Sequence, residues 1–415
     1  MTEQKQRILD LAAQYVCPGR VRTFQGLGVD LVIGRREGYR IWDVDGRELL
    51  DYHLNGGVYN LGHRNPEVMA ALHDALATLD IGNHHFPSAA RAELGEALAR
   101  LTPGDLQYSI FASGGGEAID AALKTARHAT GRRKIVSIHK GYHGHTGLAL
   151  AAGDERFSKM FLSEGSADQF VQVPFNDLDA MEAALRAGDV AAVVLETIPA
   201  TYGFPLPCEG YLAGVKASCA RHGTLYVADE VQTGLGRTGR LWGVECYGVE
   251  PDILVTGKGL SGGIYPIAAA VVSPRAARWL EEDGWGHVST FGGAEVGCCV
   301  AKKVLEISSR TDVLAGVEAT SAHLGQGLQE IQSRHADWLV EVRRQGVIMG
   351  LRFAHPQGAI FMSKALYDSC LWAMFAGHDT SVLQFKAGLL VDRAFCDETL
   401  DRFEAGLRRC LSTLG

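Results

Sequence analysis

Two short runs of apolar and β-branched residues are each followed at once by a polar residue that can carry chemistry. Thr224–Ala228 leads into Asp229, and Asp252–Thr256 leads into Lys258, which lies between two glycines. Neither run alternates with polar residues, which is typical of strands in a parallel sheet covered on both faces. Ligands gather at the carboxyl ends of such strands. We therefore expect Asp229 and Lys258 to lie close together, although they are 29 positions apart.

An acid and a lysine in these positions are the side chains that one cofactor, pyridoxal phosphate, requires. A partly desolvated lysine loses some preference for its charged form, and its amine then condenses with an aldehyde as a Schiff base. A carboxylate such as that of Asp229 keeps the ring nitrogen protonated, so that the cationic ring draws off electrons when a substrate bond breaks. Taken singly, Lys258 is compatible with a solvated loop and Asp229 with a helix cap. Their order and spacing together predict a pyridoxal phosphate site.

A run of three glycines predicts where the cofactor phosphate binds. Ser113–Glu117 joins an expected strand, Tyr108–Ala112, to an expected helix, Glu117–Ala129. A flexible turn is the ordinary role of such a run, but bare amides at a helix N-terminus also bind phosphate. Its position before a helix and upstream of the acid and the lysine favours the phosphate role. Tyr142 follows another expected strand, Lys134–His139, and is placed to stack on the ring.

Other kinds of site are not indicated. His143 and His145 lack partners at metal-ligand spacing, so we expect no metal. Nine cysteines without a CxxC pair suggest neither a disulfide framework nor zinc, and the adjacent Cys298 and Cys299 are interpreted as small core residues. A net charge of −8 without a basic cluster argues against nucleic-acid binding. Met1–Arg20 lacks the pattern of a signal peptide, and no run has the length of a membrane span, so we expect a cytoplasmic protein with no membrane partner.

The order of the expected elements predicts an α/β protein of two domains. From about residue 60 to 300, apolar strands alternate with amphipathic helices, as in a doubly wound domain. Tyr39–Tyr52 predicts a hairpin, and the mainly helical region after Cys298 has short strands expected near Val347–Phe353 and Leu389–Asp392. We expect residues 56–305 to form a large, mostly parallel-sheet domain, and residues 1–55 and 306–415 to form a smaller α+β domain.

These motifs together resemble the class III, or omega, aminotransferases, which belong to fold type I of the pyridoxal phosphate enzymes. The resemblance extends from about Val32 to Leu411, nearly the whole chain. The matching segments occur in family order and are Gly38–Gly46, Leu61–His63, Gly141–Gly144, Asp229–Gly234, Thr256–Gly263 and Ser289–Gly293.

The resemblance implies a role for each matching residue. Lys258 would hold the cofactor as a Schiff base and move protons, and Asp229 would pair with the ring nitrogen. The remaining cofactor contacts would come from Gly115 and Gly116 at the phosphate, Tyr142 and Val231 on the two ring faces, Gln232 at the phenolic oxygen, and Thr290 at the phosphate of the neighbouring subunit. The family form is therefore a homodimer with shared sites, which is also the commonest symmetric assembly.

The chain departs from the family pattern mainly where the substrate binds. Many members carry an arginine for the substrate carboxylate at a position that Gln384 occupies here, and glutamine cannot form the bidentate ion pair. Use of 2-oxoglutarate is then in doubt, unless Lys386 or Arg393 substitutes. Glu196, at the end of the expected strand Val190–Glu196, is either free to receive a cationic substrate group or paired with another basic residue. Tyr59 and Phe86 lie where the family places aromatic pocket walls, although either is also compatible with a core position.

The resemblance implies transamination between an amine or amino acid and a carbonyl acceptor, both of them small molecules, with ping-pong kinetics. The cationic ring stabilises the carbanion that forms when a substrate bond breaks. Other enzymes use the same carbanion when they act as aminomutases, decarboxylases, racemases, or enzymes of elimination, replacement or C–C bond formation, because fold does not determine reaction. A cofactor-binding protein without catalysis is a third alternative, which the presence of the lysine, the aspartate and the phosphate turn disfavours.

Overall fold

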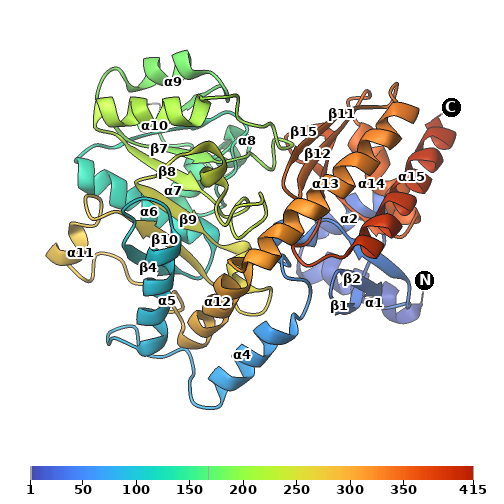
Figure 1. Ribbon diagram of the computed structural model, residues 1–415, viewed down its shortest axis with the longest axis horizontal. Coiled ribbons are helices and arrows are strands. Elements are labelled where there is room, and N and C mark those ends of the chain that lie inside the picture. The colour runs from blue at the N-terminus through green and yellow to red at the C-terminus, as the bar shows by residue number, and fades with distance from the viewer. Residues whose placement is uncertain (1, 167, 415) are drawn as a thin grey trace.

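The computed structural model describes residues 2–166 and 168–414. Figure 1 shows two parts: a large one built on a long sheet, and a smaller one that contains both ends of the chain. The chain begins in the smaller part, passes through the larger one and returns, so segments distant in sequence lie side by side. Within residues 2–166 and 168–414, none of the helices combines the length and the apolar character that a membrane span requires.

The large part contains a seven-stranded sheet in the order β4-β10-β9-β8-β7-β5-β6. Only β10 runs antiparallel to its neighbours, β4 and β9, so the predicted mostly parallel, doubly wound sheet is confirmed. The strand β10 itself was not expected. The strand bounds are β4 Tyr108–Ala112, β5 Lys134–Ile138, β6 Phe170–Val173, β7 Val190–Glu196, β8 Leu225–Asp229, β9 Ile253–Thr256 and β10 Ala268–Val272.

Helices cover both faces of this sheet, which explains why its central strands carry no polar alternation. Every residue of β7, β8 and β9 is buried. In β8, Leu225 and Val227 pack in the core that α6 covers, whereas Tyr226 and Ala228 pack in the core on the opposite face. The covering helices are α4 Pro66–Leu76, α5 Ala89–Leu101, α6 Gly115–Thr130, α7 Gly147–Ala152, α8 Glu155–Met160, α9 Leu178–Leu185, α10 Tyr211–His222, α11 Trp279–Glu282 and α12 Glu295–Ser308.

The smaller part joins the two ends of the chain through shared sheets. Its first sheet has the order β1-β2-β3-β13, in which β13 pairs in parallel with β3. Its second sheet has the order β11-β12-β15-β14. The elements are α1 Glu3–Tyr15, α2 Pro18–Gly26, β1 Ile33–Glu37, β2 Arg40–Asp43, β3 Glu48–Asp51, α3 Leu54–Gly57, α13 Thr311–Arg334, β11 Leu339–Gln345, β12 Ile348–Phe353, α14 Gly358–Asp368, β13 Leu371–Trp372, β14 Met374–Ala376, β15 Asp379–Lys386 and α15 Arg393–Leu414.

Two expectations for the smaller part have opposite outcomes. The hairpin expected over Tyr39–Tyr52 is confirmed as β2 and β3. The strand expected near Leu389–Asp392 is wrong, because β15 ends at Lys386 and the following residues turn toward the larger part. There the amide of Leu389 donates to the carbonyl of Asn60 at 2.9 Å instead of to a neighbouring strand. The proposed division of the chain at residues 55 and 305 stays a prediction.

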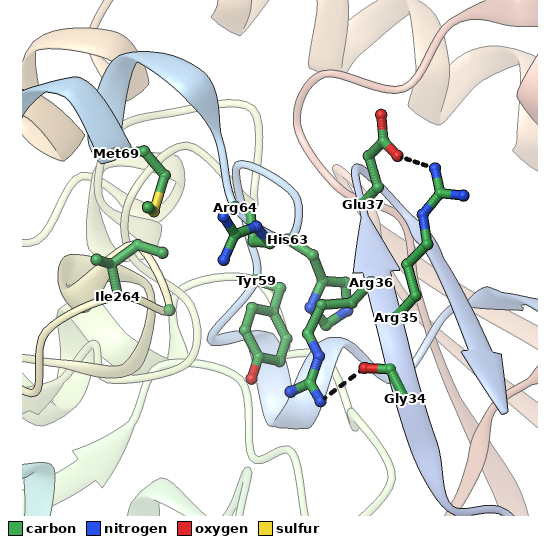
Figure 2. Close-up of a pocket in the computed structure, with 10 residues that line it drawn as sticks. Gly34, Arg35, Arg36, Glu37, Tyr59, His63, Arg64, Met69 and Ile264 are labelled. Atoms are coloured by element: carbon green, nitrogen blue, oxygen red, sulfur yellow. Dashed lines mark hydrogen bonds and ion pairs between the residues drawn. The ribbon is translucent and has the colours of Figure 1, made fainter. Parts of the chain in front are cut away.

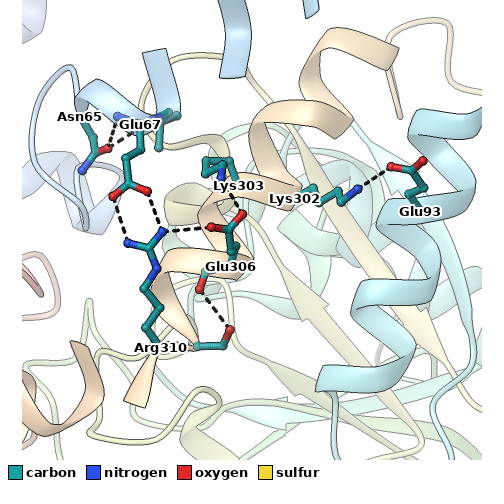
Figure 3. Close-up of polar contacts among 9 residues, drawn as sticks. Asn65, Glu67, Glu93, Lys302, Lys303, Glu306 and Arg310 are labelled. Carbon is teal, nitrogen blue, oxygen red and sulfur yellow. Dashed lines mark hydrogen bonds and ion pairs between the residues drawn. The ribbon is translucent and has the colours of Figure 1, made fainter. Parts of the chain in front are cut away.

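An exposed network of ion pairs connects α4 and α12, as Figure 3 shows. The guanidinium of Arg310 donates to both carboxylate oxygens of Glu67, at 3.0 and 2.6 Å, and to Glu306 at 3.0 Å. Lys302, on α12, pairs with Glu93 on α5. These contacts lie on the helical layer outside the sheet and link the surfaces of three helices.

Candidate active site

Asp229 ends β8 and is held by a histidine that the sequence analysis did not assign to the site. Its Oδ2 accepts a hydrogen bond from Nδ1 of His143 at 2.8 Å, and its Oδ1 accepts one from the amide of Val231 at 3.1 Å. Burial alone would lower the pKa of His143, but the hydrogen bond and the charge of Asp229 outweigh it and raise the pKa above its ordinary value. His143 is therefore a partner of the carboxylate.

Lys258 follows β9 at the same edge of the sheet, as the two strand patterns predict. Its backbone φ of 43° lies in the left-handed region, which costs a residue with a side chain about 1–3 kcal/mol. A short turn holds this conformation: the hydroxyl of Ser261 donates to the Lys258 carbonyl at 2.7 Å. Burial lowers the pKa of the Lys258 amine, partly against the nearby charges of Asp229 and Glu196. A lowered pKa makes more of the neutral, nucleophilic amine available.

The three glycines form the start of α6, beside Lys258. The N-cap residue Gly114 has no side-chain cap, so the first amides of the helix are left for another partner. A Cβ on Gly116 would lie 2.8 Å from Oγ1 of Thr146, and one on Gly115 would lie 3.2 Å from Cγ1 of Val231. Side chains are therefore excluded from this concave turn. A cavity of about 300 Å³ connects Ser113 and Gly114 with Lys258.

Glu196 is held by backbone amides, and its predicted contact with a cationic substrate group stays a prediction. One carboxylate oxygen accepts from the amide of Tyr142 at 2.9 Å, and the other accepts from the amide of Ala200 at 3.1 Å. No basic side chain forms an ion pair with it in the described part of the chain, and each of its oxygens accepts one backbone donor. Burial and the charge of Asp229 raise the pKa of Glu196 to about 7.

The residues around Asp229 and Lys258 fit pyridoxal phosphate. The side chain of Gln232 is buried and its Oε1 has no partner, so this amide is not committed to the protein. Val231 lies against the glycine turn, and the half-buried Tyr142 lies near the carboxylates of Asp229 and Glu196. The glycine turn, the Lys258 amine and the Asp229 carboxylate therefore lie near one another at this edge of the sheet, with Val231 and Tyr142 close by.

Tyr59 lines a different cavity, which Figure 2 shows. This cavity has a volume of about 790 Å³ and lies between β1 and the start of α4. The ring of Tyr59 lies against that of His63, with centroids 3.8 Å apart and ring planes tilted by 32°. Gly263 and Ile264 line both this cavity and the one at Lys258, so the two are neighbours. Tyr59 therefore lines a cavity that adjoins the one at Lys258, and its role as a wall of the substrate pocket stays a prediction.

Phe86 and Thr290 do not join the site within a single chain. The side chain of Phe86 is 69% exposed on the loop before α5. Thr290 is also exposed, beside the 58% exposed Phe291. The predicted roles of Phe86 at the substrate pocket and of Thr290 at a neighbouring subunit stay predictions.

Gln384 lies on β15 with a buried lysine beside it. The ammonium nitrogen of Lys386 donates to Oε1 of Gln384 at 2.9 Å. Arg237, which the sequence analysis did not identify, is also buried, and only its Nη2 has a protein partner, the carbonyl of Gly57 at 2.6 Å. Burial lowers the pKa of Arg237 to about 10. Basic residues in glycine-rich segments are usually exposed, so no sequence signal distinguished Arg237.

Sequence and structure comparisons agree with this geometry. A family model for class III aminotransferases matches residues 25–407. An uncharacterized aminotransferase from Archaeoglobus fulgidus is 49% identical over 387 residues, which are 93% of this chain and 90% of that protein. A putrescine aminotransferase from Pectobacterium atrosepticum is 30% identical over 428 residues, covering 100% of this chain and 91% of that protein.

Solved structures show the same fold. An ornithine aminotransferase from Toxoplasma gondii, with pyridoxal phosphate partly occupying its active site, has a TM-score of 0.89 at 25% identity and covers 99% of this chain and 96% of that one. An N-acetylornithine aminotransferase from Stenotrophomonas maltophilia has a TM-score of 0.82 at 27% identity, over 98% of this chain and 100% of that one. The family match, the relatives and the site around Lys258 lead to one conclusion: this chain belongs to the class III aminotransferases, transaminases that use pyridoxal phosphate.

Proposed function

We propose that this enzyme transfers the terminal amino group of an unbranched diamine or amino acid to a carbonyl acceptor, with Lys258 as the catalytic base. The observation that carries the proposal is the Lys258 amine, whose pKa burial lowers, at the same sheet edge as the Asp229–His143 pair. The relatives that act on putrescine, ornithine and N-acetylornithine support a four-carbon or five-carbon amine as donor.

The cofactor, when bound, supplies an aldehyde carbon for the amine and a ring that withdraws electrons from the bond that breaks. Lys258 would attach it between turnovers and would move the proton on the substrate carbon. Asp229 would hold the ring nitrogen, and His143 keeps that carboxylate in place. The other contacts would be made by Gly115 and Gly116 at the phosphate, Gln232 at the phenolic oxygen, and Tyr142 and Val231 on the ring faces.

The attachment can be tested by trapping. Borohydride treatment of the holoenzyme, followed by peptide mass spectrometry, should place the reduced cofactor on Lys258. Lys258→Ala should carry no label, whereas Lys303→Ala, a substitution at a partly exposed position of α12, should be labelled as the wild type is. Recovery of the Lys258 peptide without label would overturn the assignment.

The reaction can be tested on the same preparation. Adding putrescine or ornithine to the holoenzyme should change the visible absorbance of the cofactor and release one equivalent of an aminoaldehyde. A second carbonyl substrate should restore the spectrum, as a ping-pong enzyme requires. Loss of carbon dioxide, or a spectral change without a carbonyl product, would contradict transamination.

The proposal includes a cytoplasmic homodimer in which Thr290 reaches the partner's phosphate site. It is supported by exposed aromatic residues near Thr290, namely Trp285 at 62% and Phe291 at 58%, and by nine free thiols, which suit a reducing compartment. Thr290→Ala should weaken cofactor retention. Mixing it with Lys258→Ala should restore one intact site per heterodimer, and no restoration would exclude the shared site.

A further inference from the structure

A basic cavity adjoins the one at Lys258, and the proposed reaction gives it no role. It is the cavity of about 790 Å³ that Figure 2 shows, lined by β1, by the segment between α3 and α4, and by part of the loop after Lys258. Its charged lining residues are Arg35, Arg36, Arg64 and Glu37. Three guanidinium groups therefore share this cavity with one carboxylate.

The single carboxylate balances only one of these arginines. Glu37 accepts a hydrogen bond from Arg35, which is the ion pair drawn at the edge of the cavity in Figure 2. Arg36 donates only to two carbonyls of its own strand, at 3.3 Å each. Among the residues described, neither Arg36 nor Arg64 forms an ion pair. Arginine stays protonated in proteins, so two positive charges at this cavity lack a counter-ion.

The backbone holds Arg64 in a conformation that a residue with a side chain rarely adopts. Its φ of 54° lies in the left-handed region. Both neighbours fix it: His63 exchanges two backbone hydrogen bonds with Gly38, at 2.6 and 3.1 Å, and Asn65 caps the first amides of α4. Residues held in such conformations by their surroundings cluster at binding sites. The position of Arg64 is thus imposed by the fold.

Tyr59 and His63 connect this cavity to the reacting lysine. The buried ring of His63 contacts the carboxylate of Asp51 through Nε2 at 3.0 Å, and its Nδ1 has no partner. The ring of Tyr59 lies against His63 on one side. On the other side a Cβ on Gly263 would overlap it, so Tyr59 packs directly on the loop that follows Lys258. A ligand in this cavity would therefore lie beside the reacting centre.

Charged residues on an edge strand often serve only to prevent pairing with another strand, and β1 is the edge of its sheet. That role accounts for the exposed pair of Arg35 and Glu37. It does not account for Arg64, which lies on a different segment. The register of β1 is also irregular just before Arg36, and such a bulge redirects a side chain. In Figure 2 the side chain of Arg36 extends toward Tyr59, whereas Arg35 turns to Glu37.

We propose that this cavity binds the phosphate group of a small molecule, with the guanidinium groups of Arg36 and Arg64 as its counter-ions and the Tyr59 hydroxyl as a further donor. Guanidinium groups bind phosphate with paired hydrogen bonds, and a phosphate monoester carries about −1.5 to −2 charges at neutral pH, which matches two unpaired arginines. No residue of the glycine turn lines this cavity, so the site is separate from the one assigned to the cofactor phosphate.

Calorimetric titration of phosphate tests the site without turnover. The cofactor would first be fixed to the holoenzyme with borohydride, so that its own phosphate fills the glycine turn. The wild type should bind inorganic phosphate and pentyl phosphate at least about 10-fold more tightly than acetate, because only a dianion neutralises both arginines. Arg36→Gln and Arg64→Gln should each weaken phosphate binding about 10-fold, the effect of losing a hydrogen bond between charged groups. Arg310→Gln removes the same charge outside the cavity and should change phosphate affinity by less than about two-fold.

The two phosphate ligands distinguish the source of the group. Pentyl phosphate that binds at least as tightly as inorganic phosphate assigns the site to a phosphate ester, whereas binding of inorganic phosphate alone assigns it to the free ion. Equal phosphate affinity of the wild type, Arg36→Gln and Arg64→Gln would overturn the site, and so would acetate binding as tight as that of phosphate. Thermal unfolding of each variant shows whether the fold is intact.

The titration also separates this inference from the proposed function. A wild type that binds no phosphate loses the site, whatever its activity toward amines. A protein whose phosphate binding depends on Arg36 and Arg64, but which forms no carbonyl product from any amine, keeps the site and loses the proposed reaction. If borohydride attaches no cofactor, the same comparison of wild type and variants is made on the protein as purified.

Discussion

The cofactor end of the site and the substrate end are built in different ways. At the cofactor end, Asp229 and Lys258 follow adjacent parallel strands, and the carboxylate is satisfied on both oxygens. At the proposed substrate end, Gln384 and Lys386 lie on β15 in another sheet, and within the described residues this buried lysine forms no ion pair. The comparison indicates that the carboxylate at the cofactor end already has its partners within the chain, whereas the buried lysine at the proposed substrate end contacts only the Gln384 amide.

The largest effect is expected at the cofactor end. Lys258→Ala should lower kcat by at least about 10³-fold, because both the attachment of the cofactor and proton transfer depend on this amine. Steady-state turnover and the cofactor absorbance of the same preparation measure the two losses. If the variant kept more than about a tenth of the wild-type kcat, proton transfer would have to be assigned to another base.

Glu230 tests whether burial at this end has a cost in stability. Burial raises its pKa to about 7, against hydrogen bonds from Thr197, Thr233, Gly243 and Val244. In the unfolded chain the glutamate ionises near 4.5, so the free energy of unfolding should fall as pH rises from 4.5 to about 7. Glu230→Gln lacks this titration. The stability advantage of the wild type over the variant should shrink by roughly 3 kcal/mol across that range, as measured by urea unfolding. A constant difference would contradict the raised pKa.

His143 tests whether the carboxylate of Asp229 needs its partner. His143→Asn should lower kcat by about 10- to 100-fold, which is the rate factor that corresponds to losing a hydrogen bond to a charged group. KM should change by less than about two-fold. The absorbance of the bound cofactor should also titrate at a different pH, which general damage to the fold would not produce. The exposed His145 offers a control, since His145→Asn should leave the titration unchanged.

Gln384→Arg tests the substrate end from the opposite direction. An arginine makes a bidentate ion pair with a carboxylate, so kcat/KM for a dicarboxylic acceptor such as 2-oxoglutarate should rise by about ten-fold. Competition between 2-oxoglutarate and pyruvate as acceptors measures the change. An unchanged preference would mean that position 384 does not face the acceptor.

The smallest effect is expected away from both ends. Arg310→Gln breaks the exposed ion pairs of Figure 3, and such pairs contribute only about 0–1 kcal/mol. The free energy of unfolding should fall by less than about 1 kcal/mol, and more weakly still in high salt. A change in kcat would show that the helical layer affects the active site. The contrast between the cofactor end and the substrate end gives no reason to expect such an effect.

The two ends also differ in how far the sequence predicted them. The buried strands β7, β8 and β9 were predicted to within two residues, because covered parallel strands carry long apolar runs. His143 was considered only as a metal ligand, although it adjoins Tyr142 in a motif that the resemblance already contained. Its bond to Asp229 depends on two strands that are neighbours of β7 in the sheet, β5 and β8, and spans 86 positions.

By itself, the sequence determined the class of the chain, because local patterns specify a doubly wound sheet whose strand ends carry an acid, a lysine and a glycine turn. Only the tertiary structure decided the charge balance at the substrate end. The burial of Lys386 and Arg237, and the engagement of Glu196 by backbone amides, depend on contacts between segments far apart in the chain. The pKa of a side chain follows from its surroundings rather than its neighbours in sequence, so these properties appear only when the fold is formed.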